Sequence, residues 1–212
     1  AFSVWAARER NPALSLVGDN TLWCRTGPVN VARVRLTAAP SLAGLPDGLA
    51  YRSVTLDARR YWDLTRGYVL AARALAARSD GRDARGFLVG GFSTLRGQPL
   101  YGLAGTRVAL ANAELRFPFI DRLGLVGPVP LGSFALRGAL FADAGMVWDR
   151  GAPLRFTRER DGARRLDSPV LSFGTGVRTT ALALVLKLDV AWRTDLADVA
   201  SPRWEFSIGP EF

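Results

Sequence analysis

The residues best placed to do chemistry lie in positions 87–105, a glycine-rich stretch that reads FLVGGFSTLRGQPLYGLAG. Glycines before and after Arg96 allow tight turns and positive φ, so this stretch is predicted to be a hairpin loop carrying Arg96 and Gly97. A planar guanidinium binds carboxylates through two hydrogen bonds and stacks on aromatic rings. Charge pairing is therefore the chemistry expected of this loop, and a solvated surface arginine is the alternative.

Two carboxylates, Glu114 and Asp143, are the candidate partners of this arginine. The chain contains no histidine and one cysteine, Cys24. This excludes an internal disulfide, leaves no credible zinc site and argues against Ser-His chemistry. No nucleophile–base pair stands out, and the two carboxylates fit an arginine cage better than an acid/base pair. We therefore expect no enzyme activity, no cofactor and no metal.

The chain is strongly basic, with a net charge of +9 that comes from arginine, since Lys187 is its only lysine. A basic balance raises nucleic acid as a partner. However, the arginines are scattered singly along alternating segments and do not form a patch with stacking aromatics. Nucleic acid is therefore not an expected partner.

Eight segments alternate apolar and polar residues with a period of two, which indicates β-strands. Three precede the loop and five follow it: 29–37, 51–62, 68–78, 107–117, 134–148, 170–178, 182–193 and 204–212. The alanine-rich 68–78 is also compatible with a helix on propensity alone. Pro118 is expected to end its strand, 121–132 to form a turn and 149–167 a charged loop. Positions 1–28 are poorly defined, with hints of short strands at 2–5 and 14–16.

The apolar face of these segments is unbroken, and aromatic residues stand near the strand ends (Trp148, Trp192, Trp204 and Phe212). The opposite face mixes arginine, carboxylates, serine and glycine. Strands of about 9–12 residues with this pattern match a membrane-spanning β-barrel, whose lumen would take the polar face. There is no run of 18 apolar residues, no signal-peptide layout at the start, and no linker that would divide the chain. A soluble β-sandwich is the alternative.

Six stretches carry a family resemblance: DARRYW, GRDARGFLVGGFSTLRGQPL, NAELRFPF, FADAGMVWD, SFGTGVR and WEFSIGPEF. In this order, from about Asp57 to Phe212, the chain resembles the C-terminal half of the barrel in the BamA/TamA-type outer-membrane assembly superfamily, the bacterial surface antigen domain. The resemblance implies a sixteen-stranded antiparallel transmembrane β-barrel, of which residues 1–212 supply the C-terminal 8–10 strands. It also implies periplasmic POTRA domains upstream.

The same resemblance implies a role for the long loop at 79–105. The loop would fold back into the lumen with Arg96 and Gly97 at its tip. Strand parity puts Glu114, Phe141 and Asp143 on the lumen face, and family members pair the loop arginine with the acidic residue of an F-x-D-x-G motif. The alternative is that Asp143 pairs with Arg137 or Arg116 and leaves Arg96 free. Gln98 departs from the family, which has Phe or Tyr there, and this bears on aromatic packing at the loop tip.

The last segment is implied to be the C-terminal β-signal, read by the assembly machinery at its outward aromatic face. Its residues are Trp204, Phe206, Ile208, Gly209 and Phe212. Edge strands template the pairing of other strands, so recognition by β-augmentation has a physical basis.

The function that the resemblance implies is insertion, assembly or translocation of proteins at the bacterial outer membrane. The expected partners are outer-membrane lipid, the assembly machinery and unfolded outer-membrane proteins. Two alternatives remain open: a passive anchor or pore for an upstream domain, and a small closed barrel of eight strands.

Overall fold

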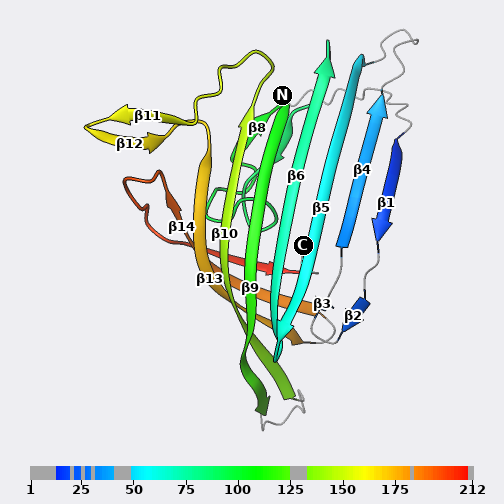
Figure 1. Cartoon of the computed structure of the whole chain (residues 1–212), viewed down its shortest axis with the longest axis vertical. Coiled ribbons are helices and arrows are strands. Elements are labelled where there is room, and N and C mark those ends of the chain that lie inside the picture. The colour runs from blue at the N-terminus through cyan, green and yellow to red at the C-terminus, as the bar shows by residue number, and fades with distance from the viewer. Residues whose placement is uncertain are drawn as a thin grey trace, which may run out of the picture.

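The computed structural model describes residues 13–19, 22–24, 27–29, 32–40, 49–124, 133–181 and 184–209. Its centre is one nine-stranded antiparallel sheet, so the all-β antiparallel prediction is confirmed (Figure 1). In spatial order the strands are β1 (Leu14–Asp19), β4 (Ala32–Pro40), β5 (Tyr51–Thr65), β6 (Tyr68–Gly81), β9 (Arg107–Gly124), β10 (Ser133–Trp148), β13 (Val170–Ala181), β14 (Leu184–Thr194) and β15 (Arg203–Ile208). Among the described residues the sheet is open, with β1 and β15 at its edges.

Three small hairpins interrupt this simple up-and-down order. They are β2–β3 (Leu22–Cys24 and Gly27–Val29), β7–β8 (Phe87–Val89 and Leu103–Gly105) and β11–β12 (Thr157–Arg160 and Ala163–Leu166). The β7–β8 pair forms the base of the glycine-rich loop, which makes that stretch a hairpin as predicted. In the part of the chain that the structure describes, no helix is long and apolar enough to cross a membrane.

The alanine-rich stretch 68–78 is a strand, because β6 is paired on both sides. Ala72, Ala74 and Ala76 face partners on β5 and on β9, so backbone hydrogen bonding to two neighbours overrides the helical propensity of alanine. Burial alternates along β6 and along β9: one face is mostly apolar and exposed, and the other is buried. The buried face is mainly apolar along β6 and at Val108 and Leu110 of β9, and polar from Asn112 to Arg116 of β9. We call the buried side the inner face and the exposed side the outer face.

Three predictions of strand ends and loops were wrong in whole or in part. Pro118 does not end its strand, since β9 continues to Gly124, so positions 121–124 of the predicted 121–132 turn are strand. The pairing of β9 with β6 ends at Arg116, so at Pro118 the strand β9 is paired with β10 alone. The register of that pairing shifts nearby, around Leu136. A missing N–H is tolerated at such an edge. Residues 149–167 are not simply a loop, because they contain the β11–β12 hairpin.

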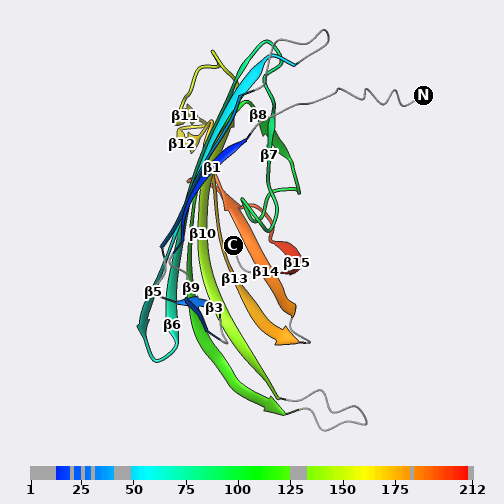
Figure 2. The same cartoon turned by 90° about the vertical axis from the view of Figure 1, so that its right-hand side faces the viewer.

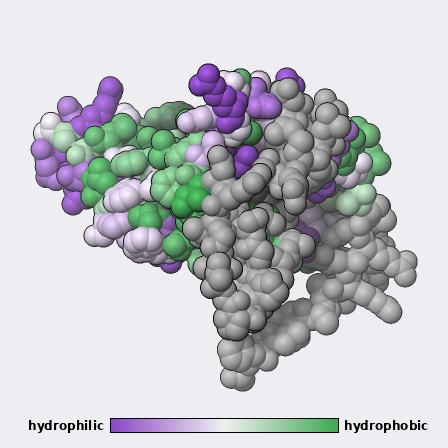
Figure 3. Space-filling model, turned by 90° about the horizontal axis from the view of Figure 1, so that it is seen from below, coloured by the Kyte–Doolittle hydropathy of each residue, from purple (hydrophilic) through white to green (hydrophobic). Residues whose placement is uncertain are grey.

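The β11–β12 hairpin is tied to the loop after β14 through Arg165. Its Nη1 donates to carboxylates of Asp195 and Asp198, at 2.6 Å each. Two contacts lower the pKa of Asp195 to about 2: first the hydrogen bond donated by the Asp198 backbone N–H, and then the one donated by the Arg165 guanidinium. Figure 3 shows a mostly hydrophilic (purple) surface on this projecting hairpin and larger apolar (green) areas on the body of the sheet.

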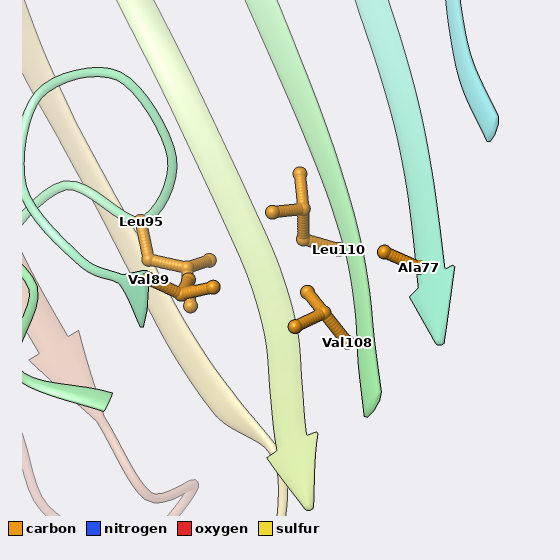
Figure 4. Packing of buried hydrophobic residues seen from close by; sticks show 5 residues of the cluster. All are labelled: Ala77, Val89, Leu95, Val108 and Leu110. Carbon is orange, nitrogen blue, oxygen red and sulfur yellow. The ribbon is translucent and has the colours of Figure 1, made fainter. Parts of the chain in front are cut away.

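The glycine-rich loop lies on the inner, concave side of the curved sheet (Figure 2). It is packed there through a small apolar cluster of Ala77, Val89, Leu95, Val108 and Leu110, in which Val89 and Leu95 come from the loop (Figure 4). The cluster covers one end of β6 and β9 and seats the loop tip, residues 95–98, which is buried throughout. The fold therefore brings Arg96 against the polar side of the sheet.

Candidate functional site: a buried arginine network under the loop

The loop backbone turns tightly before and at its tip. The Gly91 N–H donates to the Leu95 carbonyl at 3.0 Å, and the Gly90 N–H donates to the Thr94 hydroxyl at 2.7 Å. Gly97 has φ +82°, a conformation that costs a side-chain-bearing residue about 1–2 kcal/mol. These turns aim the side chain of Arg96 away from the loop and into the sheet.

Arg96 is held by two carboxylates and an aromatic ring. Its Nε and Nη2 donate to the two Asp143 oxygens at 2.8 Å each, and its backbone N–H donates to the same carboxylate at 3.2 Å. Nη1 donates to Glu114. The guanidinium carbon lies 3.6 Å from the centroid of the Phe141 ring. This is the bidentate and stacked geometry that suits arginine and that a lysine ammonium cannot reproduce.

The second carboxylate, Glu114, joins Arg96 to two further arginines. It accepts from Arg116 Nε at 2.9 Å and from Arg178 Nη2 at 3.1 Å, and Arg178 in turn donates to both oxygens of Asp189. Three positive and three negative groups therefore form one balanced set, each at most 4% exposed. We call this set the buried arginine network: Arg96, Glu114, Arg116, Asp143, Arg178 and Asp189.

The motif Phe141-x-Asp143-x-Gly145 has a simple physical meaning on β10. These three residues are spaced by two, so all of them face inward under the loop. Phe141 stacks on Arg96 and Asp143 binds it. At Gly145, a Cβ would lie 2.9 Å from both terminal carbons of Leu95, so a side chain there would displace the loop.

The loop tip has a second anchor on the last strands of the sheet. The Gly97 N–H donates to the Glu205 carboxylate on β15 at 2.8 Å. Gln98 is buried, and its amide oxygen accepts from Arg193 Nη1 on β14 at 3.3 Å. The residue that departs from the family pattern therefore contributes a hydrogen bond where the family has an aromatic ring.

Two further contacts hold the loop backbone just before the tip. Asn112 Nδ2 on β9 donates to the Thr94 carbonyl at 2.7 Å and to Asp143 at 2.9 Å. Arg73 Nη1 on β6 donates to the Ser93 carbonyl at 2.9 Å. With the network, these bonds tie one loop to β6, β9, β10, β14 and β15 directly, and to β13 through Arg178.

The structure brings five of the predicted site residues together: Arg96, Gly97, Glu114, Phe141 and Asp143. The alternative, in which Asp143 pairs with Arg137 or Arg116 and Arg96 is free, is wrong about Arg96, which binds both Asp143 oxygens, while Arg116 Nε donates to Glu114. Sequence reasoning missed Asn112, Arg178, Asp189 and Glu205 as site residues. Their inward parity was visible in the sequence, but their distance from the loop tip was not.

The predicted C-terminal residues lie apart from this network, although their strand contacts the loop tip through the Glu205 carboxylate and the Gly97 N–H. Trp204, Phe206 and Ile208 are exposed on the outer face of β15. Gly209 follows the strand with φ +140°, and its N–H donates to the Val185 carbonyl at 3.0 Å. Phe212 lies outside the described residues, as does the predicted short strand at 2–5.

The network has the chemistry of a structural brace. Its carboxylates are saturated by guanidinium groups, and such charges are stable in a dry site only when paired in this way. Within the described ranges, no group of three His, Cys, Asp or Glu side chains is placed to hold a metal ion.

A family model for the Omp85 superfamily domain matches residues 19–212, nearly the whole chain. The chain belongs to the Omp85 superfamily. This confirms the resemblance to the BamA/TamA type, a family of outer-membrane β-barrels that is generally non-enzymatic. A comparison with curated proteins gives no match.

The positive φ of Gly97 and its close packing yield a first prediction. A Cβ there would lie 3.3 Å from Ala191 Cβ and from Arg193 Cγ. Gly97→Ala should lower the free energy of unfolding by about 1–2 kcal/mol and increase protease cleavage in 87–105. Gly86→Ala is the control, because no heavy atom lies within 4 Å of its Cβ position. Equal effects of the two changes would contradict the packed tip.

The pairing of Arg96 with Asp143 yields a second prediction. Arg96→Ala and Asp143→Ala should each lower the free energy of unfolding by about 3–5 kcal/mol, because each leaves a buried charge unmatched. The double change should cost less than the sum of the single changes, by about 1–3 kcal/mol. Arg96→Lys should restore stability only in part.

Urea unfolding from lipid vesicles measures these energies. The exposed pair Arg160 and Asp161, at 3.6 Å, is the control and should show a coupling below about 1 kcal/mol. Strictly additive losses for Arg96 and Asp143 would show that the contact contributes nothing.

Proposed function

We propose that the chain is the C-terminal part of a sixteen-stranded barrel in the outer membrane, with the inner face as its lumen. The support is the contrast between the two faces of the sheet. The outer face is apolar and exposed along β6, β9 and β10, as a lipid-facing surface is. The inner face carries the buried arginine network, which an aqueous or charge-networked lumen accommodates. Membership in an outer-membrane family agrees with this placement.

We propose further that the barrel takes part in insertion, assembly or translocation of proteins at that membrane. The observation that carries this is the attachment of one loop to six strands, from β6 to β15, through the network and Glu205. A wall braced in this way can stay rigid while its edge opens. The edge strand β15 has six residues against eleven in β14, and within the described residues it pairs only with β14.

The mechanism that follows is strand addition at β15. An unfolded outer-membrane protein offers a strand to the free edge, backbone hydrogen bonds form, and the braced loop keeps β9 to β14 in register meanwhile. On this proposal Trp204, Phe206 and Ile208, with Gly209 and Phe212, are also the β-signal by which the assembly machinery recognises this chain itself. The partners are then unfolded outer-membrane proteins, that machinery and outer-membrane lipid.

Membrane placement gives a third prediction, from two equally exposed phenylalanines. Phe206 on β15 is 60% exposed and Phe156 in the loop before β11 is 61% exposed. Phe206→Asp should sharply reduce the yield of heat-modifiable protein in the outer-membrane fraction, because a charge on the lipid face is destabilising. Phe156→Asp should leave that yield unchanged. Equal yields, or recovery of the protein as a soluble monomer without detergent, would contradict the barrel.

The assembly role gives a fourth prediction. Full-length protein in lipid vesicles should accelerate folding of an added, urea-unfolded outer-membrane barrel relative to vesicles holding an unrelated barrel. In a Cys24→Ser background, Trp204→Cys should form a disulfide with a cysteine in the incoming strand. Phe173→Cys is the control, because it is exposed on β13, which is paired on both sides. A passive anchor or pore would give neither acceleration nor capture at 204.

A further inference from the structure

The outer face of the β6–β9 pair carries a track of small side chains. Three successive cross-strand pairs consist of alanine alone: Ala72 with Ala113, Ala74 with Ala111, and Ala76 with Ala109. Beside the Ala76–Ala109 pair the neighbouring strands carry Leu56 on β5 and Met146 on β10, whereas beside the other two pairs they also carry alanines. A hollow of about 800 Å³ crosses this face from β4 to β14, and its lining includes Ala58, Ala72, Ala74, Ala111, Ala113, Ala142, Ala144, Phe173 and the exposed Arg60. The Ala76–Ala109 pair lies one pair further along the same face.

Directly beyond the last alanine pair, two arginines stand opposite each other on the same face. Arg78 on β6 is the register partner of Arg107 on β9, and Arg52 on β5 is the partner of Asp80 one pair further on. Asp80 lies 3.3 Å from Arg78 Nε and 3.4 Å from Arg107 Nη2. Asp80 therefore pairs with two arginines and lies opposite a third, and these four groups together carry a charge of +2.

Placing like charges in directly opposite positions destabilises a sheet unless something else compensates. The Arg107 Nε is shielded from solvent and has no hydrogen-bond partner among the described residues, while Arg52 and Arg78 are exposed beside it. An anion with several oxygens would complete this group, since guanidinium donors match phosphate in two-point contacts.

The depth of the arginines fits a lipid headgroup. Trp148 on β10 is the register partner of Arg107, and Tyr68 stacks on Phe117 at the opposite end of β6, with ring centroids 6.3 Å apart. Aromatic residues of this kind flank the apolar band of an outer-membrane barrel. The ten residue steps from Tyr68 to Arg78 rise about 34 Å along a strand, or about 24 Å of membrane at a tilt near 45°.

We propose that this surface binds a phosphorylated, multiply acylated glycolipid of the outer leaflet. The arginines Arg52, Arg78 and Arg107 hold a phosphate, and an acyl chain passes over Ala76 and Ala109 into the alanine hollow. The inference rests on the proposed function and on the orientation that the family resemblance implies, in which the glycine-rich loop is extracellular and this end of β6 faces the cell exterior. Dispersion attraction grows with the number of closely packed atom pairs. An acyl chain seated in the hollow therefore makes more contacts with the protein than a bulk lipid chain that passes over it.

The test uses the purified full chain in detergent, with bisphosphorylated lipid A, its fully dephosphorylated form and phosphatidylglycerol as the three probes. Native mass spectrometry measures the lipid-bound fraction, and the melting midpoint gives an independent readout. Bisphosphorylated lipid A should bind at least tenfold more tightly than the other two. Equal binding of the dephosphorylated form would overturn the phosphate contact, and a preference for phosphatidylglycerol would overturn the outer-leaflet assignment.

Matched variants assign the binding to this surface. Arg78→Ala with Arg107→Ala should weaken lipid A binding at least tenfold, whereas Arg150→Ala with Arg160→Ala removes the same charge from exposed positions, one in the turn after β10 and one in β11, and should not change it. Ala111→Phe fills the hollow and should weaken binding while leaving the arginines intact. If the Arg78→Ala and Arg107→Ala double variant does not fold, Arg52→Ala replaces it and should also weaken lipid A binding. Unchanged affinity in these variants would overturn the proposal.

Heat-modifiable migration of every preparation separates this inference from the proposed function. Loss of heat modifiability in the unaltered chain would count against the membrane barrel itself. Retained heat modifiability without selective lipid A binding would count against this surface alone.

Discussion

The burial of one guanidinium sets the conditions for the rest of this structure. Arg96 lies on a loop, yet it is almost fully removed from solvent. A charge in that position is stable only if opposite charges meet it with good geometry. Asp143 and Glu114 supply that geometry, and Glu114 needs Arg116 and Arg178 in turn, which brings in Asp189. Strands β9, β10, β13 and β14 thus carry inward charges that Arg96 and Glu114 join into one network.

Much of this arrangement was predictable because a strand alternates its faces with a fixed period. The inward positions of Glu114 and Asp143 follow from parity alone, and so does the apolar outer face. Pro118 shows the limit of such reasoning. Whether a proline ends a strand depends on which side has a neighbour, and the sequence of β9 does not reveal that β6 stops pairing at Arg116.

Distances across the sheet were the part that could not be predicted. Parity tells which face a residue occupies but not how far along the strand it meets the loop tip. Arg178 and Glu114 are 64 positions apart and come within 3.1 Å only through the combined registers of β9, β10 and β13. Gln98 is a related case. Its departure from the family pattern suggested a changed loop tip, and only its proximity to Arg193 shows what replaces the aromatic ring.

The bond between Gly97 and Glu205 has a consequence for the order of folding. Its two residues are 108 positions apart, and chain segments that distant meet late because closing long loops costs conformational entropy. The loop connects β6 to β9, yet its tip bonds to β15 at the far edge of the sheet, so this contact exists only when the loop lies on the concave side and β15 has joined β14. Its formation can therefore serve as a kinetic marker of the moment at which both conditions are met.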